Sequence, residues 1–129
     1  VEFPHGYTYS GHPVACAAAL ATLDILQNDK LLDRVKAMAP VLETAVHGLR
    51  ESSLVTDIRN YGLAAGISLA HCPGQPLKRP FEVGLKCLEK GFYVRWGADT
   101  IQLAPPFIAD EEQIHGLVNA VAESLDELD

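Results

Sequence analysis

The chain has 129 residues, of which 48% are apolar, and this is enough for one compact domain with its own core. Its formal net charge of −7 at pH 7 argues against a nucleic-acid partner, which would need a basic surface. The longest mostly apolar run, residues 13–23, is too short to span a bilayer, and the N-terminus lacks the pattern of a signal peptide, so we expect no membrane partner.

The first predicted helix covers residues 13–27 and consists mostly of alanine and leucine. Pro13 suits the first turn of a helix. A helix that is apolar on nearly every side is usually buried. No element of the chain is an obvious partner, so we expect it to pack against something outside the chain. Asn28 or Asp29 should cap a second helix, which Pro40 should kink or break. The apolar residues at helical spacing in this second helix are Leu31, Val35, Met38, Leu42, Val46 and Leu49.

The middle of the chain changes from helical to strand patterns. Residues 54–59 and 63–70 are predicted as two strands joined by a turn. Residues 71–80 contain three prolines and a glycine, which predicts a loop. A helix over residues 81–90 should follow and end at Gly91.

A second strand pair and a last helix complete the chain. Residues 92–96 and 100–103 are predicted as strands around a glycine-containing turn. Asp110 should cap the last helix. The apolar residues predicted to form its buried stripe are Ile114, Leu117, Val118, Val121, Leu125 and Leu128. This order predicts an α+β fold, a small, mainly antiparallel sheet with helices packed on one face.

The chain has three cysteines, which are far apart in the sequence: Cys16, Cys72 and Cys87. An odd number without CxxC spacing argues against both a disulfide framework and a zinc site. The histidines show no metal-ligand spacing either, so no metal site is predicted. We expect the cysteines to behave as small apolar residues in a reduced, cytoplasmic setting.

The segment HGYTYSGHP, residues 5–13, precedes the first helix. Gly6 and Gly11 let backbone N–H groups approach an anion closely. Thr8 and Ser10 offer hydroxyl donors, and the N-terminus of a helix carries a partial positive charge. These features suit a phosphate, but they also suit an ordinary helix-capping loop.

Four segments in order resemble one family. HGYTYSGHPVACAAALA resembles the loop of the class III (subgroup II, fold type I) aminotransferases, which use pyridoxal 5′-phosphate. The later segments DIRNYGLAAGISL, GFYVR and DTIQLAPPFI are similar to that family as well, the first through an R-x-x-G-L-x-x-G motif and the last through a D-x-[IL]-x-[LF]-x-P-P pattern. The resemblance covers nearly the whole chain. HGYTYSGHP together with FYVRWGADT looks most like the omega-amino acid:pyruvate (beta-alanine:pyruvate) branch.

The resemblance implies roles for particular residues. Thr8 would donate its hydroxyl to the cofactor phosphate of the neighbouring subunit in a homodimer, with Tyr7 as a second cofactor-binding residue. Arg95 would pair with the carboxylate of an amino or keto acid and swing aside for substrates without one. From its position alone, at the end of a predicted strand and before a tight turn, Arg95 could equally be a surface residue. Arg59, in the R-x-x-G-L-x-x-G motif, is interpreted as structural.

The resemblance also implies that part of the catalytic machinery lies elsewhere. The chemistry of the family needs a lysine bonded to the cofactor aldehyde, and in the family this lysine lies upstream of the HGYTYSGHP segment. None of the five lysines of the chain occupies such a position, and all are predicted to be exposed: Lys30, Lys36, Lys78, Lys86 and Lys90. We therefore expect a C-terminal piece of a larger enzyme, inactive alone, whose partner is the N-terminal and large domain of that enzyme. Residues 1–28 would be its interdomain loop and connecting helix, and residues 29–129 its small domain.

Two other interpretations remain open at this stage. The chain could be an autonomous, non-enzymatic α+β domain that binds a partner or an acidic ligand. It could also belong to a class III racemase or to an aminotransferase with a different acceptor. Arg95 disfavours both the racemase and the aminotransferase with a different acceptor, because a carboxylate-binding arginine suits the omega-amino acid branch.

Overall fold

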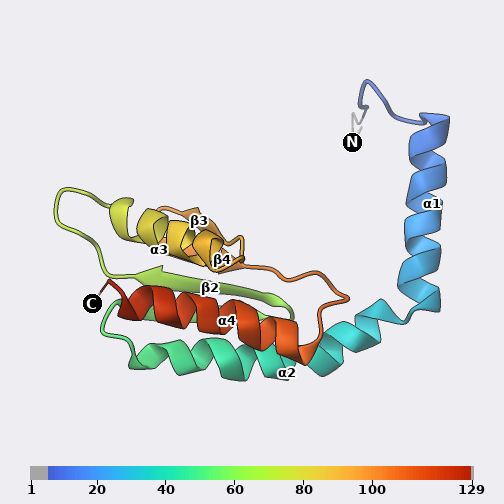
Figure 1. Ribbon diagram of the computed structural model, residues 1–129. Helices are drawn as coiled ribbons and strands as arrows, with labels where there is room; N and C mark the ends of the chain where they lie inside the picture. Colours follow the sequence, from blue (N-terminus) through green and yellow to red (C-terminus); the bar gives the residue numbers. More distant parts are fainter. Residues whose placement is uncertain (1–5, 129) are drawn as a thin grey trace, which may run out of the picture. The chain divides into compact units, whose positions relative to one another are not determined.

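In the computed structural model, which describes residues 6–128, the chain forms two compact units, Val1–Leu32 and Asp33–Asp129 (Figure 1). His5, the first residue of the HGYTYSGHP segment, lies outside the described residues. The second unit contains the sheet and the helices that pack on it. The predicted boundary between an interdomain segment, residues 1–28, and a small domain, residues 29–129, remains a prediction.

Helix α1 (Pro13–Asn28) occupies most of the first unit and begins, as predicted, with a proline in its first turn. The Nδ1 atom of His12 accepts a hydrogen bond from the backbone N–H of Ala15 and caps the helix. No residue of α1 is buried, and Leu20 is 63% exposed. The described residues therefore do not bury this apolar helix. That it packs against a partner outside the chain remains a prediction.

Helix α2 (Leu31–Gly48) continues through Pro40. Of the two predicted effects of this proline, a kink or a break, the break is therefore wrong. Pro40 and Lys36 are both exposed, which lets water hydrate the Lys36 carbonyl that the proline leaves without a donor. The predicted caps are wrong too. Asn28 is the last residue of α1 and Asp29 is its C-cap.

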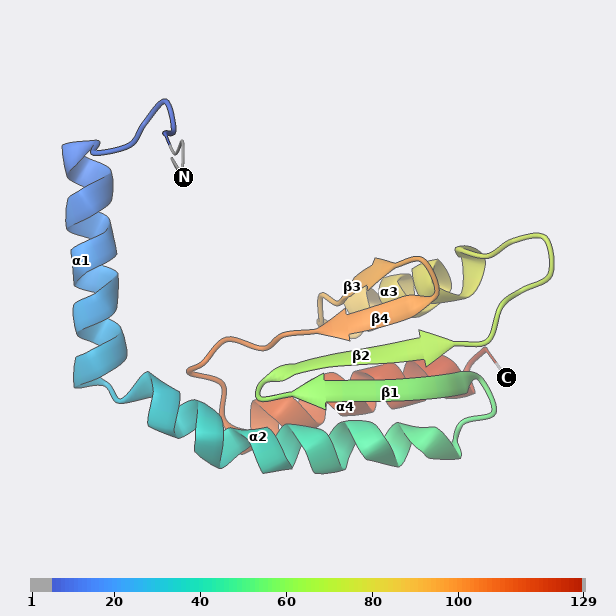
Figure 2. The same cartoon turned by 180° about the vertical axis from the view of Figure 1, so that it is seen from behind.

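The four strands form one antiparallel sheet in the order β1-β2-β4-β3, which confirms the predicted α+β class. Their bounds are β1 (Val55–Tyr61), β2 (Ala64–Leu69), β3 (Arg95–Gly97) and β4 (Thr100–Leu103). Gly62, with φ of 55°, provides the tight turn between β1 and β2. Figure 2 shows the sheet from its open face, with α3 and α4 behind it. We call this open side the helix-free face.

Helix α3 (Lys78–Glu89) begins three residues earlier than predicted, because Pro80 belongs to its first turn rather than to the loop. A proline is tolerated there, since the first helical N–H groups have no partner within the helix. The helix ends before Gly91, whose φ of 90° confirms the predicted stop.

Helix α4 (Glu111–Asp126) begins at the predicted cap. The Asp110 carboxylate accepts a hydrogen bond from the Gln113 N–H at 2.8 Å, and the Gln113 amide oxygen accepts one from the Asp110 N–H at 3.1 Å. The predicted stripe is confirmed, with Leu117 and Leu128 half-buried and its other members buried. The core between helices and sheet contains these residues with no exposed surface: Leu42, Val46, Ile67, Ile101, Ile114, Val121 and Leu125.

Gly84 lies where α3 packs against the sheet, and its contact with Trp96 gives the first testable prediction. A Cβ atom at Gly84 would lie 2.5 Å from two ring carbons of Trp96, and Phe81 packs edge-on against the same ring. We expect Gly84→Ala to lower the free energy of unfolding by about 1–3 kcal/mol, although alanine favours helix. Urea denaturation of the 129-residue chain measures this change. Gly48→Ala is the control, because nothing lies within 4 Å of its Cβ position. An equal loss in both variants would contradict the packing argument.

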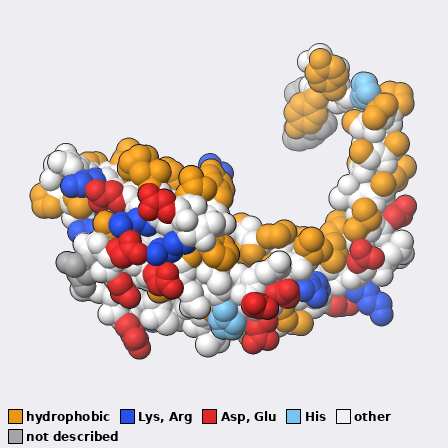
Figure 3. Space-filling model, in the orientation of Figure 1, with side chains coloured by type: hydrophobic (Ala, Val, Ile, Leu, Met, Phe, Trp, Pro, Cys, Tyr) orange, Lys and Arg blue, Asp and Glu red, His pale blue; other side chains and the backbone are white. Residues whose placement is uncertain are grey.

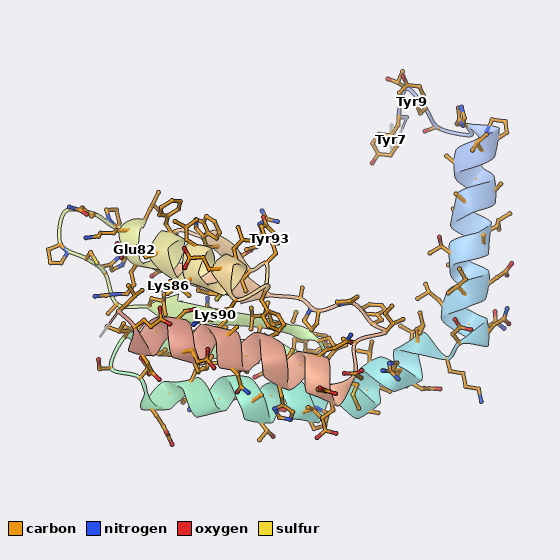
Figure 4. All side chains as sticks on the ribbon, viewed as in Figure 1. Tyr7, Tyr9, Glu82, Lys86, Lys90 and Tyr93 are labelled. Carbon is orange, nitrogen blue, oxygen red and sulfur yellow. The ribbon has the colours of Figure 1, made fainter. Side chains whose placement is uncertain are left out.

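An ion-pair cluster joins the C-terminal ends of α3 and α4 (Figures 3 and 4). The Nζ atoms of Lys86 and Lys90 lie 2.6 Å and 2.7 Å from the two carboxylate oxygens of Glu127, and Lys90 also lies 3.3 Å from Glu123. The prediction that these two lysines are exposed is wrong, since their side chains are only 28% and 27% exposed. The hydrogen bonds from Lys86 and Lys90, with the Lys86 bond the larger cause, lower the pKa of Glu127 to about 2.

This lowered pKa predicts a pH-dependent stability. The ordinary pKa of the group is 4.5, so its stabilising effect is present above that pH and is lost as the pH falls toward about 2. We expect Glu127→Gln to lower the urea midpoint near neutral pH, and the difference from the wild type to shrink across this acid range. High salt should shrink it as well. Glu89→Gln is the control, because Glu89 has no ion-pair partner among residues 6–128. A difference independent of pH would contradict the assignment.

Candidate functional site

The turn before α1 contains the two predicted cofactor-binding residues, Tyr7 and Thr8. The Tyr7 N–H donates to the Ser10 hydroxyl, and the Ser10 N–H donates to the Tyr7 carbonyl, both at 3.0 Å. Gly11 follows with φ of 75°, a conformation that favours glycine. The Tyr7 side chain is 72% exposed and projects from the turn (Figure 4).

Thr8 differs from Ser10 in having a hydroxyl that the turn does not use. Its side chain is exposed, and within residues 6–128 it makes no hydrogen bond. A hydroxyl that the turn does not use is a donor that suits a phosphate oxygen. The turn therefore fits the phosphate group that the resemblance implies.

The helix-free face of the sheet carries the third predicted residue, Arg95. The strand register aligns Arg59 with Gly66, Gly66 with Gln102, and Gln102 with Arg95, so these four residues form one row across all four strands. Arg95 is exposed, and in the part of the chain that the structure describes its side chain has neither a hydrogen bond nor an ion pair. An unpaired guanidinium on an open face can bind a carboxylate through two N–H donors.

The predicted place of Arg95 within its strand is wrong. Arg95 is the first residue of β3 rather than a residue near the end of a strand. In the register of β3 and β4, Phe92 would lie opposite Pro105, which has no N–H to donate. The ladder itself begins at Arg95.

One nitrogen of the Arg59 guanidinium is engaged within the sheet. Its Nη1 atom donates to the Asp57 carboxylate at 2.6 Å and to the Ser68 hydroxyl at 3.2 Å. Its Nη2 atom lies 3.4 Å from the position of a Cβ at Gly66, so the guanidinium extends over this glycine. The Ser68 hydroxyl lies 3.1 Å from the Thr100 hydroxyl. These contacts support the structural interpretation of Arg59.

Gln102 is the residue that sequence reasoning missed. It is exposed on the helix-free face and lines a cavity of about 350 Å³ together with Phe92, Tyr93 and Pro105. It also borders a shallow depression next to Arg59. A glutamine in a short strand carries no distinctive sequence signal, so only the register could have linked it to Arg95.

The remaining sequence predictions concern cysteines, metals and membranes. All three cysteines are free, and Cys87 is buried as expected, but Cys16 is exposed. Burial raises the pKa of the Cys87 thiol. Among residues 6–128 no group of acidic, histidine and cysteine side chains could hold a metal ion. No helix in this described range is long and apolar enough to cross a membrane.

Comparison with known proteins identifies the family. A sequence profile described as Aminotransferase class-III matches residues 2–125 of the chain. The chain therefore belongs to the class III aminotransferases, a class of pyridoxal-phosphate-dependent enzymes, which confirms the family inferred from its motifs.

Two curated relatives come from the predicted branch. The chain is 53% identical over 125 residues to the beta-alanine–pyruvate aminotransferase of Pseudomonas aeruginosa, covering 97% of the chain and 28% of that protein. It is 49% identical over 128 residues to the omega-amino acid–pyruvate aminotransferase of Pseudomonas putida, covering 99% of the chain and again 28% of that protein. The chain thus spans little more than a quarter of the length of these relatives.

Solved structures agree with this assignment. The adenosylmethionine-8-amino-7-oxononanoate aminotransferase of Methanocaldococcus jannaschii matches with a TM-score of 0.84 and 31% identity, over 98% of this chain and 30% of that one. Tyr7 and Thr8 lie in the first unit of the chain and Arg95 in the second, so neither unit contains all three predicted site residues.

Proposed function

We propose that the chain is the C-terminal part of a pyridoxal-phosphate-dependent omega-amino acid:pyruvate transaminase. The observation that carries this proposal is the 53% identity, over nearly the whole chain, to a beta-alanine–pyruvate aminotransferase. The exposed, unpaired Arg95 on the helix-free face supports the substrate class, since amino and keto acids both carry a carboxylate.

The turn before α1 would hold part of the cofactor. The Thr8 hydroxyl would donate to the phosphate bound mainly by the neighbouring subunit of a homodimer, with Tyr7 beside it as a second contact. When bound, the cofactor supplies an electron sink for the carbanion chemistry of amino-group transfer. The contribution of this turn is binding and orientation, because a phosphate held from two subunits cannot rotate freely.

Arg95 would select and orient the substrate. Its planar guanidinium would bind the carboxylate of beta-alanine, and then that of pyruvate, through two parallel hydrogen bonds. For an amine without a carboxylate, the long arginine side chain would move aside. The same site would thus accept substrates of both kinds.

The rest of the enzyme would supply what the chain lacks. The lysine that bonds to the cofactor would come from a large domain, and α1, which has no buried residue here, would pack against that domain. A reduced, cytoplasmic setting belongs to the same proposal, consistent with three free cysteines.

The decisive experiment compares the 129-residue chain with the full-length protein. We expect the full-length protein to form alanine from beta-alanine and pyruvate when pyridoxal 5′-phosphate is present. The chain alone should show no turnover, because no lysine is placed to bond to the cofactor. Borohydride reduction followed by peptide mapping is the second readout. Turnover by the chain with one trapped lysine would contradict its inactivity, and absence of turnover by the full-length protein would favour a non-enzymatic domain or another class III activity.

A further inference from the structure

Gln102 and Arg95 face each other across the antiparallel pair of β3 and β4. Directly opposite residues in such a pair have their Cβ atoms only about 4.5–5.5 Å apart, so their side chains are within reach. Both are exposed on the helix-free face. Neither makes a hydrogen bond to a side chain in the described part of the chain.

The side chain of Gln102 leans toward the strand that carries Arg95. Its Nε2 atom lies 3.1 Å from the position that a Cβ atom would occupy on Gly97, the last residue of β3. The absence of a side chain at Gly97 leaves room for the amide group there. The amide therefore lies over β3, two residues along the strand from Arg95 and on the same face.

The carboxylates of Asp57 in β1 and of Asp99 in the turn between β3 and β4 are already engaged. Asp57 binds Arg59 at 2.6 Å, and Asp99 accepts a hydrogen bond from Thr100 at 2.9 Å. Asp99 also lies 3.6 Å from the Nε2 atom of His71. The amide oxygen of Gln102 is thus the acceptor that the sheet leaves open to the guanidinium of Arg95.

We propose that Gln102 is a positioning residue for Arg95, and that its amide oxygen accepts a hydrogen bond from the guanidinium when this group has moved away from the substrate carboxylate. This inference rests on the proposed function. A neutral acceptor stabilises the displaced arginine without competing strongly with a carboxylate. Gln102 would thus set the balance between substrates with a carboxylate and substrates without one.

Two substitutions of Gln102 in the full-length enzyme should have opposite effects. In Gln102→Glu a charged acceptor holds Arg95 in the displaced position, so kcat/KM for beta-alanine should fall about tenfold or more. The value for 1-phenylethylamine should stay unchanged or rise. In Gln102→Leu the displaced arginine has no acceptor, so kcat/KM for 1-phenylethylamine should fall about three- to tenfold while that for beta-alanine is retained.

Propanoate binding gives a readout that does not depend on turnover. Measured by calorimetry, the Kd of propanoate for the full-length enzyme should rise about tenfold or more in Gln102→Glu and should not rise in Gln102→Leu. Gln75→Glu and Gln75→Leu are matched controls, because Gln75 is an exposed glutamine in the loop before α3. These two controls should change neither donor preference nor propanoate binding.

The outcomes separate this inference from the proposed function. If the wild-type enzyme does not act on beta-alanine, both are overturned. Arg95→Ala could lower kcat/KM for beta-alanine much more than for 1-phenylethylamine while each Gln102 variant changes both values alike. In that case only the role of Gln102 is overturned. An unchanged propanoate Kd in Gln102→Glu, with the thermal midpoint intact, overturns it as well.

Discussion

Replacement of Arg95 by alanine in the full-length enzyme should separate substrates by their carboxylates. Beta-alanine and pyruvate would lose their bidentate partner, and truncating one member of such a charge pair costs about 2–5 kcal/mol. This corresponds to a roughly thirtyfold to several-thousandfold loss in kcat/KM. An amine without a carboxylate, such as 1-phenylethylamine, should lose little in its own half-reaction, since Arg95 only has to move aside for it.

Half-reaction kinetics with the two donors measure this contrast. The comparison is informative because a merely destabilising substitution would affect both donors alike. Arg50→Ala is a matched control, since Arg50 is an exposed arginine in the short helix after α2. Equal losses for both donors in Arg95→Ala, with the fold intact, would mean that Arg95 is structural.

Thr8→Ala should weaken cofactor binding in the full-length enzyme. The hydroxyl would donate to an anionic phosphate, and loss of such a charge-assisted hydrogen bond costs about 1.5–3 kcal/mol. The Kd of pyridoxal 5′-phosphate should therefore rise roughly tenfold to 150-fold. Titration of the apoenzyme, followed by the absorbance of the bound cofactor, measures this shift.

Two further variants test whether the Thr8 hydroxyl itself is responsible. Thr8→Ser keeps a hydroxyl donor and should retain most of the affinity. Thr22→Ala is the control in α1, where the Thr22 hydroxyl donates to the Ala18 carbonyl at 2.9 Å and is thus used locally. Cofactor affinity unchanged in Thr8→Ala would show that the turn does not reach the phosphate.

The sequence predicted the order and type of the elements because periodicity and caps are local signals. Asp110 and Gln113 cap α4 within four residues of each other, and the sequence contains this information directly. Pro80 was assigned to the loop because proline is common in loops. In the structure it lies in the first turn of α3, where a proline is tolerated. The break at Pro40 was wrong because its cost depends on whether water reaches the freed carbonyl, and a linear sequence does not give exposure.

The site was only partly predictable for a similar reason. Motifs identified Thr8 and Arg95 as candidates, since each lies in a segment that resembles the family. The partners of Arg59 could not be anticipated, because Ser68 reaches it only through the pairing of β1 with β2. Gln102 required the register of a further strand pair. Contacts across a sheet depend on which strands become neighbours, and this is a property of the fold.

The junction between the two helices has a practical consequence for handling the protein. Lys30, exposed and with φ of 50°, is the only lysine or arginine in residues 1–32. Arg34, the next one, is half-buried and donates to the carbonyl oxygens of Ile108 and Ala109. Trypsin cleaves after lysine and arginine, so brief digestion should cut first after Lys30. This single cut would release residues 31–129 with their core intact, as a fragment free of the apolar helix and suited to crystallisation or NMR.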